Sequence, residues 1–383
     1  MLYIVIDGAL FMVKDGAPIP VPNGFIAERE KEAERQKGLT DWRNAQREQQ
    51  DPYFNAATIW GASRGRYTGR WRFHSAAVTR DGSICYTMKN ALVTALFRYD
   101  PAVQEDRRLF HKSDFHEEGM TALPDGRIVV AMRDEKGVVD LALFDGEMKF
   151  DGYLTGGDSI DQFPAASLTD GDRVLYSSRG IARTEQGVVA AFGPSSLFSV
   201  AVERREVVEM AAEPEKDLLL PKEGSDGSLY YIRSPYDAPF RPGLIQTLKD
   251  ALLFPVHLLF AIFGFLTVFV KLFDRRPPKP LGPQAMPPQE SAWRTILGKT
   301  VDTRTVEKNA GKGEGPALVP RSWELVRRSP DGAEEVIARN VAAFDLAFDG
   351  TVYFTNGYKL RSFDGKDTKT ILKEDLIERV FCA

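Results

Sequence analysis

The chain repeats an Asp-Gly dipeptide between short runs of residues that favour β-strands. Asp-Gly suits the tight turn of a β-hairpin, because these residues accept the positive φ that such a turn requires. The repeated segments are SAAVTRDGSICYTM, GMTALPDGRIVVAM, FPAASLTDGDRVLYSS, LLLPKEGSDGSLYYIR and FDLAFDGTVYFTNG. With the strand-like runs that follow, each unit holds four strands in roughly 40 residues, which is the size of a propeller blade.

The two ends of the chain complete each other as parts of one further unit. The N-terminal run MLYIVIDGALFMVKDGAPIPV superposes on TVYFTNGYKLRSFDGKDTKTIL but lacks an inner strand, which LIERVFCA at the C-terminus can supply. Pairing of this kind removes exposed sheet edges. The sequence therefore predicts an all-β fold, a six-bladed β-propeller closed by its N- and C-terminal strands. An open β-sandwich with coincidental turns is the alternative.

We expect a single domain over residues 1–383, with the blades in chain order and two insertions between their strands. The expected boundaries are 1–22 plus 375–383 for blade 1, 72–113 for blade 2, 117–155 for blade 3, 163–212 for blade 4, 217–237 plus 321–339 for blade 5 and 341–374 for blade 6. The insertions cover the remaining stretches 23–70 and 238–320.

Both insertions are expected to be helical and to lie on one face of the disc. The first holds AEREKEAERQK and DWRNAQREQQ, which favour a charged, solvated helix over a nucleic-acid arm. The second holds an apolar run followed by a Pro- and Gly-rich stretch, which predicts a flexible return. One insertion joins an outer strand to the next inner strand, and the other joins a second strand to a third. Connections of these two kinds open on the same rim.

The apolar run Ala251–Val270 is long enough to cross a bilayer. A single crossing would place the two parts of a closed ring on opposite sides of the membrane, and a buried soluble helix fits poorly because apolar residues occur all round. We therefore expect a monotopic helix, or a hairpin bent at Pro255 and Gly264. The residues expected to contact the membrane are Leu252, Phe254, Leu258, Phe260, Phe263, Phe265, Val268 and Phe269, with the basic Lys271, Arg275 and Arg276.

Composition and short motifs narrow the location and the function. The chain has 50 Lys and Arg against 54 Asp and Glu, so no overall charge attracts nucleic acid. Its two cysteines, Cys85 and Cys382, form neither a disulfide framework nor a metal motif. Met1 leads into the strand-like LYIVI without the features of a signal peptide, and basic residues flank the apolar run on both sides. These features predict the cytoplasmic side of a membrane. The sequence holds no P-loop, dinucleotide fingerprint or HExxH motif, and its GxSxG match, GASRG at residues 61–65, falls within the charged insertion rather than between a predicted strand and helix.

Residues just before each inner strand are expected to face the propeller axis on the insertion-bearing face. Counting back eight positions from each turn glycine selects His74, Glu118, Phe163, Leu219 and Ala342. Close to them in the chain lie His116, Glu117, Asp161, Gln162, Asp217 and Asn340. We take His74, His116 and Glu118 as catalytic candidates, because they offer an acid-base pair or metal ligands. Ordinary solvated loop residues are the alternative interpretation.

The segment LAFDGTVYFTNG resembles the inner-strand repeat of the strictosidine synthase-like and gluconolactonase superfamily, which includes paraoxonases and senescence marker proteins. The resemblance extends to an insertion between the second and third strands of a late blade. It implies a six-bladed propeller with calcium at the axis, for which Glu118, Asp161, Asp217 and Asn340 would be the ligands. The chain departs from the family pattern at His74, Phe163, Leu219 and Ala342.

Three functions follow as expectations. The first is a membrane-associated propeller that binds an amphipathic small molecule or a membrane-protein partner at its insertion-bearing face. The second is a metal-dependent lactonase or esterase of lipophilic substrates, with His74 as base, His116 as a second base or a ligand, and Glu118 as a metal ligand. The third is a scaffold that forms homo-oligomers.

Overall fold

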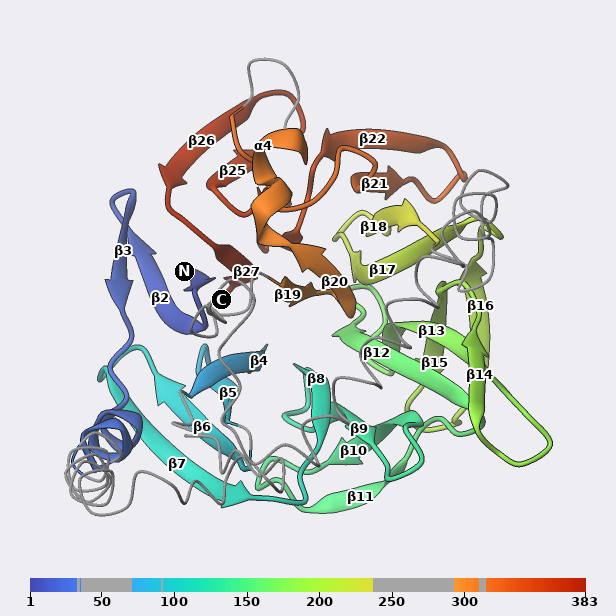
Figure 1. Cartoon of the computed structure of the whole chain (residues 1–383), viewed down its shortest axis with the longest axis horizontal. Helices are drawn as coiled ribbons and strands as arrows, with labels where there is room; N and C mark the ends of the chain where they lie inside the picture. Colours follow the sequence, from blue (N-terminus) through green and yellow to red (C-terminus); the bar gives the residue numbers. More distant parts are fainter. Residues whose placement is uncertain (33–34, 36–70, 91, 237–292, 310–314) are drawn as a thin grey trace, which may run out of the picture.

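The protein is a β-propeller. The computed structural model describes residues 1–32, 35, 71–90, 92–236, 293–309 and 315–383. Most of its strands form antiparallel sets of four, two of which are joined into one larger sheet by a parallel strand contact, and Figure 1 shows these sets arranged as a ring. We number the sets as blades in the order used above.

The first three blades take their strands from the N-terminal part of the chain and from its last strand. Blade 1 holds β1 (Leu2–Ile6), β2 (Ala9–Lys14), β3 (Ala17–Pro20) and β27 (Ile377–Cys382). Blade 2 holds β4 (Arg72–Val78), β5 (Ile84–Lys89), β6 (Thr94–Asp100) and β7 (Glu105–Lys112). Blade 3 holds β8 (Glu117–Ala122), β9 (Ile128–Arg133), β10 (Val139–Phe144) and β11 (Phe150–Tyr153).

The other blades follow in chain order, and the second insertion interrupts blade 5. Blade 4 holds β12 (Ser159–Ala166), β13 (Arg173–Arg183), β15 (Ser196–Ala201) and β16 (Val207–Ala211), with β14 (Val189–Phe192) paired to β13. Blade 5 holds β17 (Lys216–Glu223), β18 (Leu229–Pro235), β21 (Glu324–Arg328) and β22 (Glu334–Arg339). Blade 6 holds β23 (Ala343–Leu346), β24 (Val352–Thr355), β25 (Lys359–Phe363) and β26 (Thr368–Lys373).

The two ends of the chain meet in blade 1. Strand β27 runs antiparallel to β1, with Ile4 opposite Val380. The Ala383 backbone N–H donates to Met1 O at 2.8 Å, and the Met1 amino group donates to Ala383 O. The expected closure of the ring by its terminal strands is confirmed, and the open sandwich is excluded.

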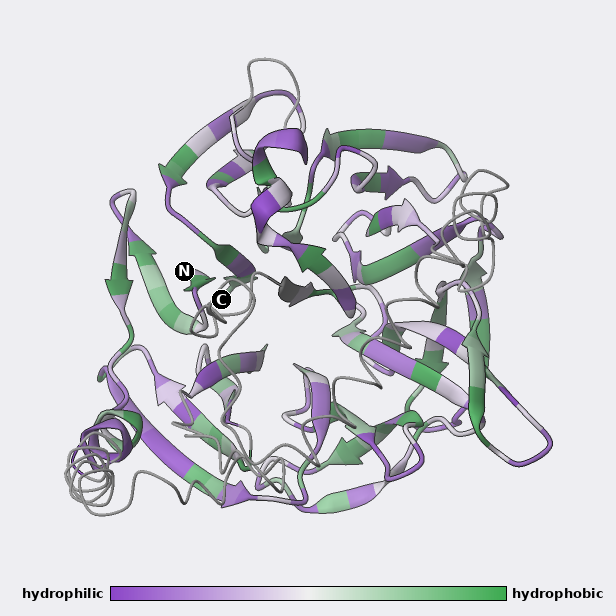
Figure 2. Ribbon diagram, in the orientation of Figure 1, coloured by the Kyte–Doolittle hydropathy of each residue, from purple (hydrophilic) through white to green (hydrophobic). Residues whose placement is uncertain are grey.

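Apolar side chains fill the spaces between neighbouring blades. In β5, residues 84–88 are buried without interruption, because blades cover both faces of this sheet. Figure 2 shows hydrophobic residues along most of the strands around the ring. Fully buried side chains such as Phe97, Tyr231 and Phe344 form this core. Burial of one such side chain stabilises the fold by about 1.5–3 kcal/mol.

The repeated Asp-Gly dipeptides form the turns between the first and second strands of blades. In blade 3, Gly126 adopts φ +91° and its N–H donates to Leu123 O at 3.0 Å. The Asp125 carboxylate accepts the Arg127 N–H at 2.9 Å, so the aspartate fixes the turn that the glycine permits. Gly350 takes the same place in blade 6, with φ +86°.

Only parts of the two insertions belong to the described residues. In the first, residues 24–32 form a helix, and Asn23 caps it by accepting the Ile26 N–H at 2.8 Å. In the second, the described part folds as a hairpin of β19 (Trp293–Ile296) and β20 (Lys299–Asp302), followed by the short helices η1 (Thr303–Thr305) and α4 (Val306–Asn309). The expectation of a flexible return was wrong for 293–309.

The apolar run 251–270 and the basic residues 271, 275 and 276 lie outside the described residues. Among the residues that are described, no helix combines the length and the apolar character that a membrane crossing needs.

Candidate functional site

The innermost strands of blades 2 to 5 are each interrupted by a bulge. The pairing register shifts between Phe73 and Ser75 in β4 and between Glu117 and Gly119 in β8. It shifts again between 162 and 165 in β12 and between 219 and 222 in β17. Three of the residues selected by counting back from the turns, at 74, 118 and 163, lie within these bulges. A bulge turns a side chain out of the regular ladder of the sheet. We call the face of the disc on which these bulges lie the axial face.

An axial cluster of His74, Ser75, Thr87, Lys89 and Glu117 joins blade 2 to blade 3. The Glu117 side chain is fully buried. Its Oε1 lies 2.8 Å from His74 Nδ1 and 3.5 Å from Lys89 Nζ, and it accepts a bond from the Thr87 hydroxyl. Its Oε2 accepts a bond of 2.8 Å from the Ser75 hydroxyl. Both carboxylate oxygens are therefore occupied by donors of the protein itself.

Two opposing effects set the pKa of Glu117. Burial disfavours the charged form and would raise the pKa, but the positive environment of His74 and Lys89, with the bond from Thr87, holds the pKa of Glu117 well below its ordinary value. His74 Nε2 lies 3.4 Å from Lys89 Nζ, so both ring nitrogens face groups of the cluster itself. A general base needs a free nitrogen facing its substrate. The cluster is therefore arranged as a structural ion network.

Glu118 links blade 3 to blade 4 from its position in the bulge. Its Oε1 accepts a bond of 2.8 Å from Arg133 Nε, and its Oε2 accepts one of 3.3 Å from Gln162 Nε2. The third catalytic candidate, His116, is exposed, and within the described part of the chain no hydrogen bond or ion pair joins its side chain to His74 or Glu118. The structure thus does not bring the three candidates together.

Asp161 is buried in blade 4 and bonds to its own sheet. Its Oδ1 accepts a bond of 2.6 Å from the Ser178 hydroxyl, and burial raises the pKa of the carboxyl group. The neighbouring Asp140 has a pKa raised to about 6, chiefly by burial and then by the charges of Asp161 and Asp134. Two buried carboxylates close together repel each other when both are charged. At mildly acidic pH the pair of Asp140 and Asp161 therefore tends to keep a proton.

Asp217 holds the hairpin of the second insertion against the axial face. Its Oδ2 lies 2.6 Å from Lys299 Nζ in β20, and its Oδ1 accepts the Ser195 N–H at 2.8 Å. At the tip of the hairpin, Leu297 and Gly298 have φ of 49° and 76°, as a two-residue type I′ turn requires. Leu297 packs in one apolar cluster with Phe163 of blade 4. Figure 1 places β19 and β20 toward the centre of the ring.

Asn340 and Ala342, which precede the first strand of blade 6, have structural roles, as does Leu219 in blade 5. The Asn340 amide donates to Asn309 O and to Val319 O, both at 2.9 Å, and so ties the end of the second insertion to the blade. Ala342 and Leu219 are buried in the apolar core. Asn340 therefore uses its amide nitrogen to hold the backbone of the second insertion.

The residues expected to hold calcium do not fit that ion. Calcium takes about six to eight oxygen ligands, whereas Glu118 is bound to Arg133, Asp217 to Lys299 and Asp161 to Ser178. Among the described residues, no group of three or more His, Cys, Asp and Glu side chains is placed to hold a metal ion. The structure thus does not bring the four expected ligands together.

Four basic residues near the axis were missed by counting from the turns. Lys89 is the last residue of β5, Arg179 lies in β13, Arg379 lies in β27 and Lys299 lies in the hairpin. None of them precedes an inner strand, so spacing from the Asp-Gly turns cannot select them. Each stands at a strand end or in a strand with other charged residues, so no local charge pattern marks them in the sequence.

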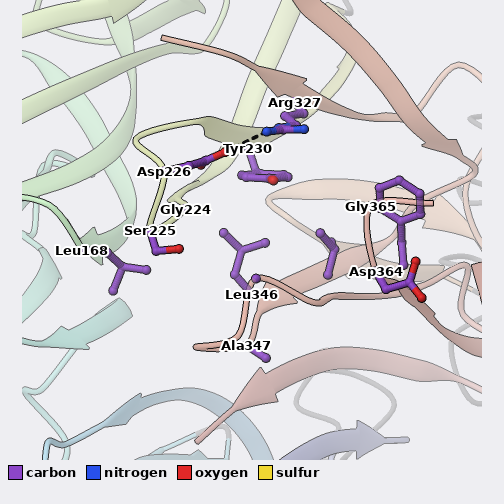
Figure 3. A pocket seen from close by; sticks show the side chains of 13 residues that line it. Leu168, Gly224, Ser225, Asp226, Tyr230, Arg327, Leu346, Ala347, Asp364 and Gly365 are labelled. Atoms are coloured by element: carbon purple, nitrogen blue, oxygen red, sulfur yellow. Dashed lines mark hydrogen bonds and ion pairs between the residues drawn. The ribbon is translucent and has the colours of Figure 1, made fainter. Parts of the chain in front are cut away.

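The opposite face of the disc, which carries the Asp-Gly turns, has a cavity of about 210 Å³ between blades 5 and 6. Tyr230, Leu346 and Val352 are among the residues that line it. Figure 3 shows Asp226 and Arg327 at its edge, where Arg327 Nη2 lies 2.7 Å from Asp226 Oδ2. The cavity therefore lies apart from the charged groups of the axial face.

Comparisons with known proteins add similarities of fold at low sequence identity. No protein-family model matches the sequence, and no curated protein matches it. The structure is similar to TolB from Acinetobacter baumannii, with a TM-score of 0.49 and 10% identity over 100% of this chain and 66% of that chain. It is also similar to a nidogen/laminin complex, with a TM-score of 0.47 and 6% identity over 99% of this chain and 96% of that chain.

A third similar structure is a putative TolB from Agrobacterium tumefaciens, with a TM-score of 0.41 and 12% identity over 79% of this chain and 81% of that chain. The chain spans less than two thirds of the length of the Acinetobacter protein. None of these three is named as a strictosidine synthase-like or gluconolactonase protein, and that resemblance stays a prediction.

Proposed function

We propose that the protein associates with a membrane through its axial face and binds an amphipathic small molecule or a membrane-protein partner there. One observation carries the proposal: Lys299 Nζ of the hairpin donates to Pro235 O, at the end of β18, over 2.6 Å. Pro235 is where the chain leaves blade 5, and Lys299 belongs to the segment that returns. The exit and the return are therefore in contact on one face.

This contact bears on the apolar run Ala251–Val270, which lies between the two points in the sequence. A segment that crossed a bilayer once would separate its flanks by the hydrocarbon core, which is about 30 Å thick. Contact between Pro235 and Lys299, on either side of this stretch, instead favours a segment that enters and leaves the same leaflet, as a monotopic helix or hairpin does.

The charges after the apolar run support the same proposal. Lys271, Arg275 and Arg276 follow it directly, and Lys249 precedes it. Each basic residue close to an anionic surface contributes about 1 kcal/mol of binding. Basic residues on both flanks favour the cytoplasmic leaflet for both. The axial face would then lie against the headgroups on the cytoplasmic side.

The test is sedimentation of the full chain with lipid vesicles. We expect the protein to remain bound to vesicles of phosphatidylcholine and phosphatidylglycerol after a carbonate wash, because apolar burial does not depend on charge. Replacing residues 251–270 by a Gly-Ser linker of equal length should release it into the supernatant. If the full chain is washed off as readily as this variant, the anchoring proposal is wrong.

A charge variant serves as the matched control. Changing residues 271, 275 and 276 to Gln should weaken binding to anionic vesicles by roughly a hundredfold, which corresponds to about 3 kcal/mol. Binding to pure phosphatidylcholine vesicles should not change. Monodisperse oligomers that need no detergent would favour the scaffold instead.

A further inference from the structure

The cavity of about 210 Å³ on the face that carries the Asp-Gly turns lies between the facing sheets of blades 5 and 6. Blade 5 lines it with Tyr230 and Arg327, which are opposite each other in β18 and β21. Blade 6 lines it with Leu346, Val352 and Phe363, which are successive partners across β23, β24 and β25. Partners across strands share one face of a sheet. The two sheets thus form two walls, and Figure 3 shows Tyr230 and Arg327 on one side of the cavity and Leu346 on the other.

Glycines in the turns of both blades keep the rim of the cavity open. Gly350 and Gly365 of blade 6 line it, and a Cβ added to either would meet no described atom within 4 Å beyond its chain neighbours. Gly224 lies in the turn of blade 5, and a Cβ there would lie 3.1 Å from Tyr230 Cε2. The lack of a side chain at Gly224 therefore leaves room for the Tyr230 ring, and the other two glycines leave room for a small molecule.

Tyr230 brings a buried hydroxyl group to this cavity. The residue is only 8% exposed, and its hydroxyl forms a hydrogen bond with none of the residues that the structure describes. The Arg327 guanidinium lies over its ring, 6.0 Å from the ring centroid. Burial raises the pKa of Tyr230, so the hydroxyl keeps its proton at neutral pH and acts as a donor. Buried polar groups normally have a hydrogen-bond partner, and an acceptor atom in the cavity would supply one.

The charged residues that line the cavity favour an uncharged ligand. Asp226 Oδ2 lies 2.7 Å from Arg327 Nη2, which neutralises both groups. Asp364 Oδ1 accepts the N–H groups of Lys366 and Asp367 in its own turn, at 3.0 and 2.8 Å. With two carboxylates against one guanidinium in its lining, the cavity repels an anion. A cation would lose its hydration between the apolar walls, which is unfavourable without a charged partner there.

We propose that the cavity between blades 5 and 6 binds an uncharged small molecule that consists of one apolar ring and a carbonyl oxygen. The ring would lie between the walls formed by Tyr230 and Val352, and the oxygen would accept the hydrogen bond of the Tyr230 hydroxyl. The size fits, because an apolar cavity of about 150 Å³ holds benzene and this one is larger. The site lies on the face opposite the axial face and does not rest on the proposed membrane association.

Titration of the full chain in detergent, with ¹³C-labelled Leu and Val methyl groups observed by NMR, tests both binding and location. The probes are cyclohexanone, cyclohexanecarboxylate and cyclohexylammonium, which share one ring and differ in charge. Cyclohexanone should shift the methyl signals of Leu346 and Val352 with a Kd of about 1 mM, as expected for so small a ligand. The signals of Leu197, which packs between blades 4 and 5, should not move. The two charged probes should bind at least tenfold more weakly.

Tyr230→Phe removes the hydroxyl and keeps the ring. It should raise the Kd of cyclohexanone about fivefold, which corresponds to about 1 kcal/mol for one hydrogen bond between neutral groups. Tyr231→Phe is the matched control at the next position. The Tyr231 hydroxyl donates to Glu334 Oε1 at 2.9 Å, and the residue packs in the apolar cluster between blades 4 and 5. This variant should bind cyclohexanone with the Kd of the unchanged protein.

Three results would overturn the proposal. Cyclohexanone might leave the methyl signals of Leu346 and Val352 in place, a charged probe might bind as tightly as the ketone, or Tyr230→Phe might bind the ketone with an unchanged Kd. The variant with residues 251–270 replaced separates this site from the anchoring proposal. It should bind cyclohexanone as the unchanged protein does, even if the full chain proves not to bind vesicles at all.

Discussion

Removal of residues 376–383 is expected to abolish the cooperative folding of the ring. The deletion removes β27, in which Ile377 and Val380 are buried against Ile4 and Leu360. Two fully buried side chains contribute about 3–6 kcal/mol, and the backbone bonds between β27 and β1 are lost as well. This loss is comparable to the total stability of a typical domain, about 5–15 kcal/mol. Chemical denaturation followed by circular dichroism measures it.

A circular permutant provides the control for this truncation. Because residues 1 and 383 are hydrogen-bonded to each other, a short Gly-Ser linker can join them, and new ends can open in the exposed turn at 331–332. This protein keeps β27 and should unfold cooperatively near the midpoint of the unchanged chain. A truncated protein with an unchanged midpoint would contradict the role assigned to β27.

Glu117→Gln is expected to lower the free energy of unfolding by about 3 kcal/mol, because removing one partner of a buried ion pair leaves the other uncompensated. The effect should depend on pH with a definite sign. The folded state holds the pKa of Glu117 below its unfolded value, so its contribution is present above the unfolded value and is lost as the pH falls toward the folded value. Urea unfolding between pH 7 and pH 3 should show the two proteins converge in acid.

Glu118→Gln is the matched comparison, one position along the chain. Glu118 has one ion pair, with Arg133, and its side chain is 24% exposed. Its loss should cost about 1 kcal/mol or less, because solvent screens a pair of this kind. Equal effects at both positions, or a Glu117→Gln effect that does not diminish in acid, would show that the axial cluster is not a buried ion network.

The repeated Asp-Gly turns were sufficient to predict a β-propeller, and the strand patterns of the two ends were sufficient to predict its closure. Turn geometry is local, and residues such as Asp125 and Gly126 adopt it from their own chemistry. The two ends also carry runs of strand-forming residues that complete each other as one blade. The pairing of β1 with β27 could therefore be expected.

The partners of the axial residues could not be predicted in the same way. Spacing brought His74 and Glu118 to the bulges, yet the buried anion is their neighbour Glu117, whose donors come from another blade. The hairpin at 293–302 was missed because its contacts, such as Lys299 with Asp217, join residues far apart in the chain. Such contacts depend on the assembled ring and leave no periodic pattern in the sequence.

Disulfide formation between position 2 and the native Cys382 tests the central claim, that strands from both ends close the ring. Leu2 lies opposite Cys382 in the register, next to the hydrogen-bonded pair of Met1 and Ala383. A pair in this position has Cα atoms about 4.5 Å apart, within reach of a disulfide. In catalysed oxidation, Leu2→Cys should form an intramolecular disulfide that shifts its mobility on a non-reducing gel, while Ile19→Cys in β3 should not. Failure of Leu2→Cys to form this disulfide in the folded protein would contradict the closed ring.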